Sequence, residues 1–454
     1  MNRLEFLKCS FLSLLSPSVL FADEMAKKSA QMVNSENKNA PLMLGGKSHY
    51  WNKNTRLTIA MWDFSWLTDQ GQGGKYENIE RRVAEAAARG YNTLRIDCFP
   101  SRLLQKNTSF FKGYNPGEAL TIPCWGQVTT NFSCNALQKL KQLADACRKH
   151  NIWLGLDSWE KGHMMGHKSA LVLDIERSVI PETQEEKALR DFGHTWVKAI
   201  RLMRDEGILE RAVWIAPMNE VPHFASRSLE SIRKISAHNQ NEGNVKLDKN
   251  RLTNERYKQI NLWMAEEIKD EISKEDIPLS YSSLGAEEFN ERLPEIYDVV
   301  DVHFMPNCIY SREETERFEA LGKGVSGGMN FQRYEKIDLR RYSELWNQAC
   351  KKHYAEMLLR TRNYMKGTLE RTIFPSGKRM QAVITESFGP CFWPDHLDVN
   401  WEWYKHYNGD SARIAASMPF EGVSLSNFGE PIFTLWEDED WHRNANLFTL
   451  NVLE

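Results

Sequence analysis

The sequence predicts a single (β/α)8 barrel, the α/β fold known as the TIM barrel, from three observations. Short apolar runs typical of buried strands alternate with longer segments typical of amphipathic helices. Eight such strand–helix units fit between residues 56 and 454, and this alternation implies a parallel sheet with right-handed crossovers. No glycine-rich phosphate-binding loop follows any of the strands, which disfavours the alternative fold, an open doubly wound sheet.

The first half of the chain contains four of the predicted strands. Each is a short run of apolar residues, and Gly90 is a stop signal for the first helix. A long loop with Gly, Pro and Asn follows the second strand. The strands are expected at residues 57–63, 93–100, 152–159 and 213–220, and the helices at 76–89, 134–150 and 182–205.

The second half repeats this rhythm up to its last unit. Residues 430–454 show no long, clean helical pattern, so the eighth helix is expected to be short or irregular. A Gly-rich loop is expected near 322–328. The strands are expected at 278–283, 298–304, 382–386 and 422–428, and the main helices at 254–273, 339–366 and 401–418.

The amino terminus has the pattern of a secretory signal peptide. Arg3 and Lys8 supply positive charge, residues 11–21 are mostly apolar, and Ala22 suits cleavage. The apolar run is too short to span a membrane. We therefore expect a signal peptide at 1–22, a polar linker and lead-in at 23–55, a catalytic barrel at 56–454, and an exported (periplasmic or secreted) protein.

Composition excludes some classes of partner and site. The net charge of −3 gives no electrostatic reason to expect nucleic acid or an anionic membrane surface. The cysteines are spread out without a CxxC motif, so a zinc site is not expected. Cys124 and Cys134 could pair in an exported protein, and the sequence leaves this open along with the oligomeric state. The 15 tryptophans suit a sugar-binding cleft as well as a large core.

Two of the predicted strands end in glutamate. The run from Val213 leads into Asn219 and Glu220, and the run from Ala382 leads into Glu386. A carboxylate at the end of a buried strand is costly unless it has partners or a function. A pair of carboxylates at one rim is the minimum apparatus for cleaving a glycosidic bond.

Other polar residues follow the same pattern. Active sites in this fold lie at the carboxyl ends of the strands, so the residues at those ends are candidates. They are Asp63, Arg95, Asp97, Trp159, Glu160, Asn219, Glu220, His303, Glu386 and Asn427.

Three short motifs resemble one known family. The segments 90–96 (GYNTLRI), 218–220 (MNE) and 384–386 (ITE) look like the strand-2, strand-4 and strand-7 signatures of a clan of retaining glycoside hydrolases. This clan includes the cellulase-like family 5 enzymes. The resemblance covers the architecture of the whole barrel, but in sequence only these motifs.

The resemblance implies an activity and a set of roles. It implies a retaining hydrolase that cleaves the O-glycosidic bonds of a β-linked oligo- or polysaccharide through a covalent intermediate, without a cofactor. Glu220 matches the acid/base and Glu386 the nucleophile. Asn219 matches the residue that binds the sugar 2-hydroxyl, and Arg95 the arginine that keeps the nucleophile ionised.

Two positions depart from the family 5 pattern. The sixth strand ends His303-Phe-Met rather than His-x-Tyr, so the missing tyrosine must come from elsewhere, for example Tyr310. The usual strand-8 tryptophan is replaced by Asn427-Phe, and Trp436 or Trp393 could substitute for it. These departures suggest the sugar-binding cellulase-like group rather than a true cellulase.

Each candidate also has a purely structural interpretation. Glu220 and Glu386 could be carboxylates in ion pairs with arginine, and His303 could be a core histidine. Trp159 and Glu160 are well placed for sugar contact. The run from Trp436 to Trp441 could instead be a solvated rim, and a metal at His163 and His167 is disfavoured by flanking glycines.

The alternative function is a barrel that binds carbohydrate without cleaving it. The presence of Arg95, Asn219, Glu220 and Glu386 together favours the enzyme.

Overall fold

The computed structural model describes residues 56–112, 125–160, 184–220, 254–283, 289–305, 310–321, 338–389, 395 and 400–451. The predicted signal peptide, the linker, the Gly-rich loop near 322–328 and the residues Cys124, His163, His167 and Trp393 lie outside the described residues.

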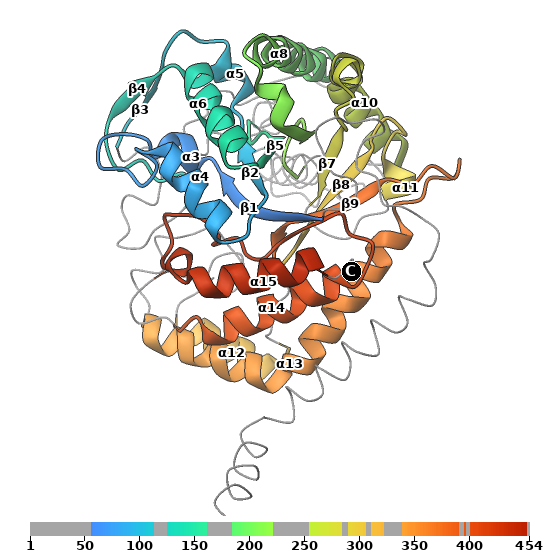
Figure 1. Ribbon diagram of the computed structural model, residues 1–454. Helices are drawn as coiled ribbons and strands as arrows, with labels where there is room; N and C mark the ends of the chain where they lie inside the picture. The colour runs from blue at the N-terminus through green and yellow to red at the C-terminus, as the bar shows by residue number, and fades with distance from the viewer. Residues whose placement is uncertain are drawn as a thin grey trace, which may run out of the picture.

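Eight parallel strands form the barrel that the sequence predicts (Figure 1). Their order around the sheet is β6-β5-β2-β1-β10-β9-β8-β7. A single parallel bridge between Ile215 and Leu279 joins the two ends of this order, β6 and β7, and closes the ring. The strands are β1 (Leu57–Asp63), β2 (Thr93–Asp97), β5 (Trp153–Asp157), β6 (Ala212–Ile215), β7 (Ser280–Ser283), β8 (Val299–Phe304), β9 (Gln381–Ser387) and β10 (Gly422–Ser424).

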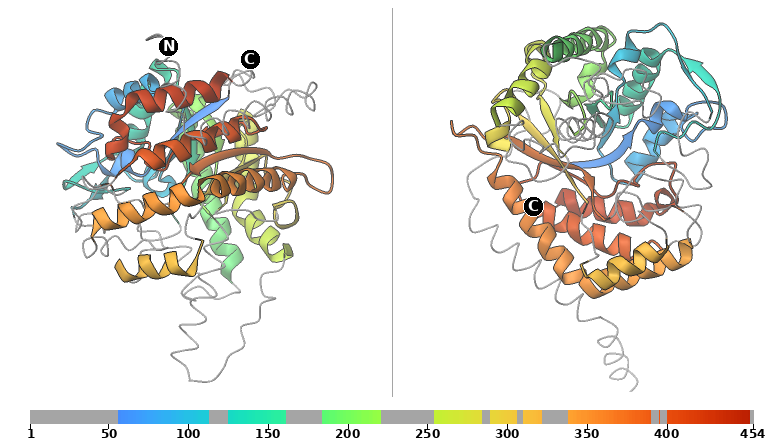
Figure 2. Two further views of the ribbon diagram at one scale, coloured as in Figure 1. Left: turned by 90° about the horizontal axis from the view of Figure 1, so that it is seen from below. Right: turned by 180° about the vertical axis from the view of Figure 1, so that it is seen from behind.

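Helices surround the strands, as Figures 1 and 2 show. Helices α8 and α10 pack against each other on one side of the barrel, and α13, α14 and α15 lie side by side on the other. The main helices are α4 (Ile79–Ala88), α6 (Ala136–Lys149), α8 (Glu185–Asp205), α10 (Asn254–Ile272), α12 (Arg312–Leu321), α13 (Leu339–Glu370), α14 (Glu402–Ala416) and α15 (Glu439–Asn451). None of the described helices combines the length and apolar character that crossing a membrane requires.

Short elements decorate the loops between these units. A helical turn, α3 (Ser65–Thr68), follows β1, and α11 (Phe289–Arg292) precedes β8. After β2, the turn α5 (Pro100–Leu103) leads to a two-stranded antiparallel hairpin, β3 (Thr108–Phe110) and β4 (Phe132–Cys134). The sequence pattern predicts a loop where this hairpin lies.

The last helix corrects one expectation. Helix α15 is a regular helix of 13 residues, where the sequence pattern predicted a short or irregular one. Its buried face carries His442, Asn446 and Thr449, which follow helical spacing but are polar. Asn446 Nδ2 donates to the Arg89 carbonyl at 2.9 Å, and His442 contacts the Tyr91 hydroxyl at 2.8 Å. Because the inner face is hydrogen-bonded rather than apolar, no apolar period marks the helix.

A small apolar cluster fills the inside of the barrel below the polar strand ends. Leu57, Ile59, Trp214, Val299 and Val383 belong to it and are all buried. Side chains on one face of a strand recur every second residue. The positions of Leu57 and Ile59 therefore continue along β1 to Asp63, at the carboxyl end.

Gly155 makes room for the largest member of this cluster. It pairs in register with Trp214, and a Cβ placed on Gly155 would lie 2.2 Å from the Trp214 ring. We expect Gly155→Ala to lower the free energy of unfolding by about 1–3 kcal/mol, because the buried ring cannot give way without strain. Urea denaturation measures this change.

Gly409→Ala is the matched control for Gly155→Ala. Nothing lies within 4 Å of a Cβ at Gly409, which is in helix α14, where alanine is favoured over glycine by roughly 1 kcal/mol. Equal effects of the two substitutions would contradict the packing argument.

Candidate active site

A buried arginine stands at the centre of the polar strand ends. Arg95, on β2, has no exposed surface. Its Nη1 donates to Asp63 Oδ1 at 2.8 Å and to Glu386 Oε1 at 2.9 Å. Its Nη2 donates to Asp157 Oδ2 at 2.7 Å. One guanidinium thus holds carboxylates from β1, β5 and β9 in fixed positions.

Two further acceptors complete the surroundings of Arg95. Nη2 donates to Asn219 Oδ1 at 2.5 Å, and Asp301 Oδ2 lies 3.6 Å from Nε. The hydroxyl of Ser282, on β7, also donates to Asn219 Oδ1, at 2.7 Å. These two donors fix the orientation of the Asn219 amide, with its oxygen turned towards Arg95.

The pairing of the strands, including an irregularity between β8 and β9, brings these side chains together. Asp97 and Asp157 are partners on β2 and β5, so both carboxylates lie at the same height. On β8 and β9 the pairing shifts by one residue between Val302 and His303, which makes His303 the partner of Glu386. Such a bulge re-aims a side chain, and here it places an imidazole beside a glutamate.

Two of these residues adopt an unusual backbone conformation. Asp63 has φ of 35° and Glu220 has φ of 52°, in the left-handed region that costs a non-glycine residue roughly 1 kcal/mol. Strained residues persist where the surrounding structure over-determines them, and they cluster at functional sites. Both residues occur where a strand has just ended and its side chain turns into the polar cluster.

The two glutamates meet across His303. His303 Nδ1 lies 2.8 Å from Glu220 Oε1 and 3.4 Å from Glu386 Oε1. One ligand atom of each of the three side chains lies within 4.8 Å of those of the other two. All three residues are buried.

The charges in this cluster are unequal. Burial lowers the pKa of His303, but the carboxylates of Glu386 and Asp301 more than offset this and raise it to about 10. Burial raises the pKa of Asp157 to about 7 despite the opposing effect of Arg95. Burial also raises the pKa of Asp63 well above its ordinary value, again against Arg95.

The same three side chains have the spacing of a metal site but not its charge. Among the described residues, the side chains of Glu220, His303 and Glu386 lie close enough together to act as ligands of one metal ion. The guanidinium of Arg95 lies 2.9 Å from Glu386, and the carboxylates of Glu386 and Asp301 raise the pKa of His303 to about 10 against the effect of burial. Both features oppose the binding of a further cation beside Glu386.

Three other predicted site residues lie near the strand ends and have protein partners. Asn427 Oδ1 accepts from the backbone N–H of Ser387 at 2.6 Å. Glu160 Oε1 accepts from the backbone N–H of Ser101 at 2.9 Å, and Trp159 packs edge-on against Phe64 at 5.3 Å. The roles of Asn427, Glu160 and Trp159 in sugar binding stay predictions.

The structure does not bring Trp436 to this cluster, which corrects that prediction. Trp436 is 1% exposed and stacks on Tyr91 at 6.0 Å, with the Arg89 guanidinium 4.5 Å from its ring centre. It also contacts Trp62 of β1 edge-on, so it lies in the layer between the barrel wall and helices α4 and α15. Its acidic neighbours in sequence suggested a solvated rim, although Trp436 itself is core.

Tyr310 does not supply the missing tyrosine through any of its described contacts. Its ring packs edge-on against His353 at 4.7 Å, and the Arg360 guanidinium lies 3.9 Å from its ring centre. Both partners belong to helix α13, outside the barrel.

Sequence reasoning missed Asp157 and Asp301, which contact Arg95. Both are completely buried within strands. The available signal was their alternation, because Asp157 follows Gly155 and Asp301 precedes His303 by two residues and therefore shares the inward face. Both residues lay inside the predicted strands at 152–159 and 298–304 rather than at their ends, so neither was among the candidates.

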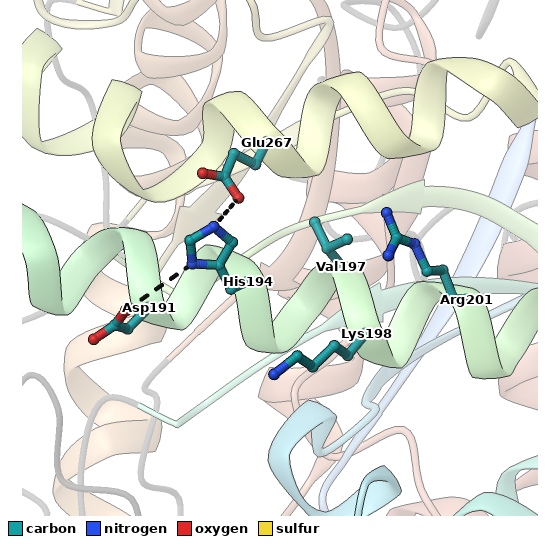
Figure 3. Close-up of a pocket in the computed structure, with 6 residues that line it drawn as sticks. All are labelled: Asp191, His194, Val197, Lys198, Arg201 and Glu267. Atoms are coloured by element: carbon teal, nitrogen blue, oxygen red, sulfur yellow. Dashed lines mark ion pairs between the residues drawn. The ribbon is translucent and has the colours of Figure 1, made fainter.

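A separate hollow lies on the outer surface of helices α8 and α10 (Figure 3). His194 contacts Glu267 there at 2.7 Å, but its side chain is about half exposed. The lining is charged and solvated, and the hollow has no described contact with the Arg95 cluster. It is therefore not part of the candidate site.

Comparisons with known proteins agree on the architecture. A sequence profile described as "Cellulase-like: Sugar-binding cellulase-like" matches residues 59–449. A solved structure from Parabacteroides distasonis, provisionally described as a glycoside hydrolase, is 21% identical with a TM-score of 0.62, and the alignment covers 87% of this chain and 94% of that one. A search of curated proteins gave no match.

Two further solved structures match with lower similarity. A family 5 mannosidase from Rhizomucor miehei is 11% identical with a TM-score of 0.43, covering 88% of this chain and 94% of that one. An endo-β-1,4-mannanase from Thermotoga petrophila is 12% identical with a TM-score of 0.42, covering 90% and 78%.

Proposed function

The chain belongs to the sugar-binding cellulase-like family, and we propose that it is a glycoside hydrolase that cleaves β-linked glycans with retention of configuration. One observation carries the proposal: Glu220 and Glu386 approach each other across His303, with an oxygen of each inside a 4.8 Å group. Retaining enzymes hold their carboxyl groups about 5–5.5 Å apart, whereas inverting enzymes leave about 6.5–9.5 Å for a water. The short approach supports attack by a carboxylate rather than by water.

In the first step Glu386 attacks the anomeric carbon and the bond to the leaving oxygen breaks. The ion pair with Arg95 at 2.9 Å favours the charged form that attack requires. Glu220 gives its proton to the leaving oxygen, so the departing group is a neutral alcohol. The sugar is then an ester of Glu386.

In the second step Glu220, now a carboxylate, removes a proton from water, and the water oxygen attacks the anomeric carbon. The ester bond to Glu386 breaks and its carboxylate returns to Arg95. Two inversions at one carbon give net retention. Asn219, with its oxygen fixed by Arg95 and Ser282, binds the sugar 2-hydroxyl in this proposal, as the family resemblance implies.

Product stereochemistry tests the proposal. The full chain would be screened on a panel of aryl glycosides and plant or algal polysaccharides, and proton NMR would record the first-formed sugar from any substrate that turns over. We expect the anomeric configuration of the substrate to be kept. Inversion would remove the covalent mechanism, whereas binding without turnover would identify the alternative, a carbohydrate-binding barrel.

A further inference from the structure

His303 lies between carboxylates on both sides of its ring. Nδ1 faces Glu220 at 2.8 Å and Glu386 at 3.4 Å. Nε2 faces Asp301 Oδ2 at 3.3 Å. The ring is buried, with 2% of the residue exposed, so bulk water does not compete for these contacts.

Asp301 is itself fixed in place. It lies two residues before His303 on β8, so both side chains share the inward face. Thr385 Oγ1 donates to Asp301 Oδ1 at 2.6 Å, and Arg95 Nε lies 3.6 Å from Oδ2. Asp301 is thus the one described carboxylate that contacts both His303 and Arg95 without belonging to the glutamate pair.

The His303 ring can donate a hydrogen bond to the carboxylates on both of its sides only when Nδ1 and Nε2 are both protonated. Neutral imidazole carries one N–H, whereas imidazolium carries two. A neutral ring would turn a lone pair either to Asp301 or to the glutamates. Glu220 could cover Nδ1 with its own proton, but Glu386 must stay ionised before attack, so an anion faces Nδ1 even then.

We propose that Asp301 is a positioning residue that holds His303 as an imidazolium between the two catalytic glutamates. This inference rests on the proposed function for its kinetic consequence but not for its structural one. The imidazolium favours the charged form of Glu220, so it sets the pH at which this acid releases its proton.

The remaining charges around the ring agree with this assignment. Glu386 and Asp301 raise the pKa of His303 against the effect of burial. Burial raises the pKa of Asp301, but His303 and Arg95 outweigh it and lower that pKa below its ordinary value. The other groups that face or influence the ring are Glu220, Asp63 on β1, Ser282 on β7 and Thr385 on β9.

Nitrogen NMR of histidine side chains tests the protonation state directly. The chain has 12 histidines, and His303→Gln identifies the signal that belongs to this ring. We expect both ring nitrogens of His303 to stay protonated from pH 5 to above pH 8. A wild-type ring that loses a proton near its ordinary pKa would overturn the proposal whatever any variant does.

Asp301→Asn removes the charge and keeps the shape. We expect His303 in this variant to titrate within the same pH range, because one anion is gone and the amide can donate to Nε2 instead. Unchanged protonation in Asp301→Asn would show that Asp301 does not hold the charge. Because this readout needs no turnover, it stands even if the protein proves to bind sugar without cleaving it.

Two matched variants separate charge from packing. Asp157→Asn removes a buried carboxylate that contacts Arg95, and no described contact joins Asp157 to His303. Thr385→Val removes one hydrogen bond to Asp301 and leaves its charge. We expect His303 to stay protonated in both. Titration of His303 in Asp157→Asn would mean that any loss of buried charge is sufficient.

Once a substrate is known, the pH dependence of kcat/KM gives a second test. With a neutral His303, Glu220 holds its proton more firmly, so the basic limb of the pH profile of kcat/KM should move up by about one unit in Asp301→Asn. The wild-type enzyme and Thr385→Val should share one profile. A lower rate at every pH with no shift of the limb would indicate a merely structural role for Asp301.

Discussion

Glu386→Ala should abolish turnover on every substrate, with a loss on the order of 10⁵-fold in kcat, as expected when a covalent nucleophile is removed. The side chain is buried against Arg95 at 2.9 Å, and the substitution removes the carboxylate that would form the ester. Azide can enter the gap and attack the anomeric carbon directly. The product should then be a glycosyl azide of inverted configuration, identified by proton NMR.

Glu220→Ala should behave differently, because it removes the proton donor and leaves the nucleophile. Poor leaving groups should lose most of their rate, by about 10²–10⁴-fold. An aryl glycoside with an acidic phenol needs little protonation and should still form the covalent intermediate. Azide should then release the sugar with retained configuration, and exchanged behaviour of the two variants would reverse the assignment.

Glu421→Ala is the control for both substitutions. Glu421 is buried in the same barrel but precedes β10, at the amino end, where its charge and that of Arg56 influence each other. Its removal should cost stability without changing the configuration of any product or creating azide dependence.

Arg95→Met should cost more stability than any other single change at the site. The substitution keeps the bulk and leaves Asp63, Asp157, Asp301 and Glu386 without their common cation. Removing one partner of a buried ion pair typically costs 3–5 kcal/mol. Arg95→Lys should recover little, since one ammonium cannot reproduce a planar guanidinium that contacts carboxylates on several sides.

The cost of Arg95→Met should also grow with pH. Without the guanidinium, the buried carboxyls must be protonated in the folded state, so their folded pKa values lie above the unfolded values near 4. A folded state that binds more protons than the unfolded state loses stability as pH rises. Asp301, whose wild-type pKa lies below its ordinary value, makes the difference grow from about pH 4 upward. Asp157, with a pKa already raised to about 7 in the wild type, adds to the difference only above pH 7.

Urea denaturation at several pH values measures this effect. The difference between wild type and Arg95→Met should be smallest near pH 4 and widen towards pH 7. Arg81→Met, which breaks an exposed pair with Glu85, should change stability by less than about 1 kcal/mol at any pH. A pH-independent loss in Arg95→Met would point to packing rather than charge.

The strands were predictable because each one is a short apolar run that can be recognised from neighbouring residues alone. The apolar runs that lead to Asp63 and Glu386 match β1 and β9 closely, whereas the run predicted as a strand at 213–220 forms one, β6, only over Ala212–Ile215. Glutamates at two strand ends, an arginine on the second strand and a histidine on the sixth could be named as candidates because barrel closure brings carboxyl ends together. The family resemblance implied a contact of Arg95 with Glu386. The approach of His303 to Glu386 could not be predicted, since it depends on the register shift between β8 and β9.

The features that could not be predicted are mostly polar residues that are buried. Asp157 ends β5 and Asp301 lies inside β8, and acidic residues are disfavoured in strands. Arg95 offsets the burial of both, and His303 also offsets that of Asp301. Helix α15 buries His442 and Asn446, so its inner face has no apolar period. Trp436 is an apolar ring in an acidic segment, and its stacking partner, Tyr91, lies far away in sequence.

The closure of the barrel by one backbone bridge has a dynamic consequence. Between β6 and β7 the bridge at Ile215 and Leu279 is the one backbone pairing that the described residues show. Above it, Ser282 of β7 contacts Asn219 at 2.7 Å across the same seam, and His303 of the next strand, β8, contacts Glu220 at 2.8 Å. These side-chain contacts therefore help to hold β6 beside β7, where the backbone pairing is sparse.

Because these contacts involve residues of the proposed active site, substrate binding should affect local opening of the barrel between β6 and β7. Segments with few backbone hydrogen bonds open at lower free energy than the rest of a fold, so the amides of β6 and β7 should exchange hydrogen faster than those of β8 and β9. A sugar that contacts Asn219 and Glu386 together would bridge the seam and slow this exchange. Bound substrate would then stabilise the closed barrel against local opening.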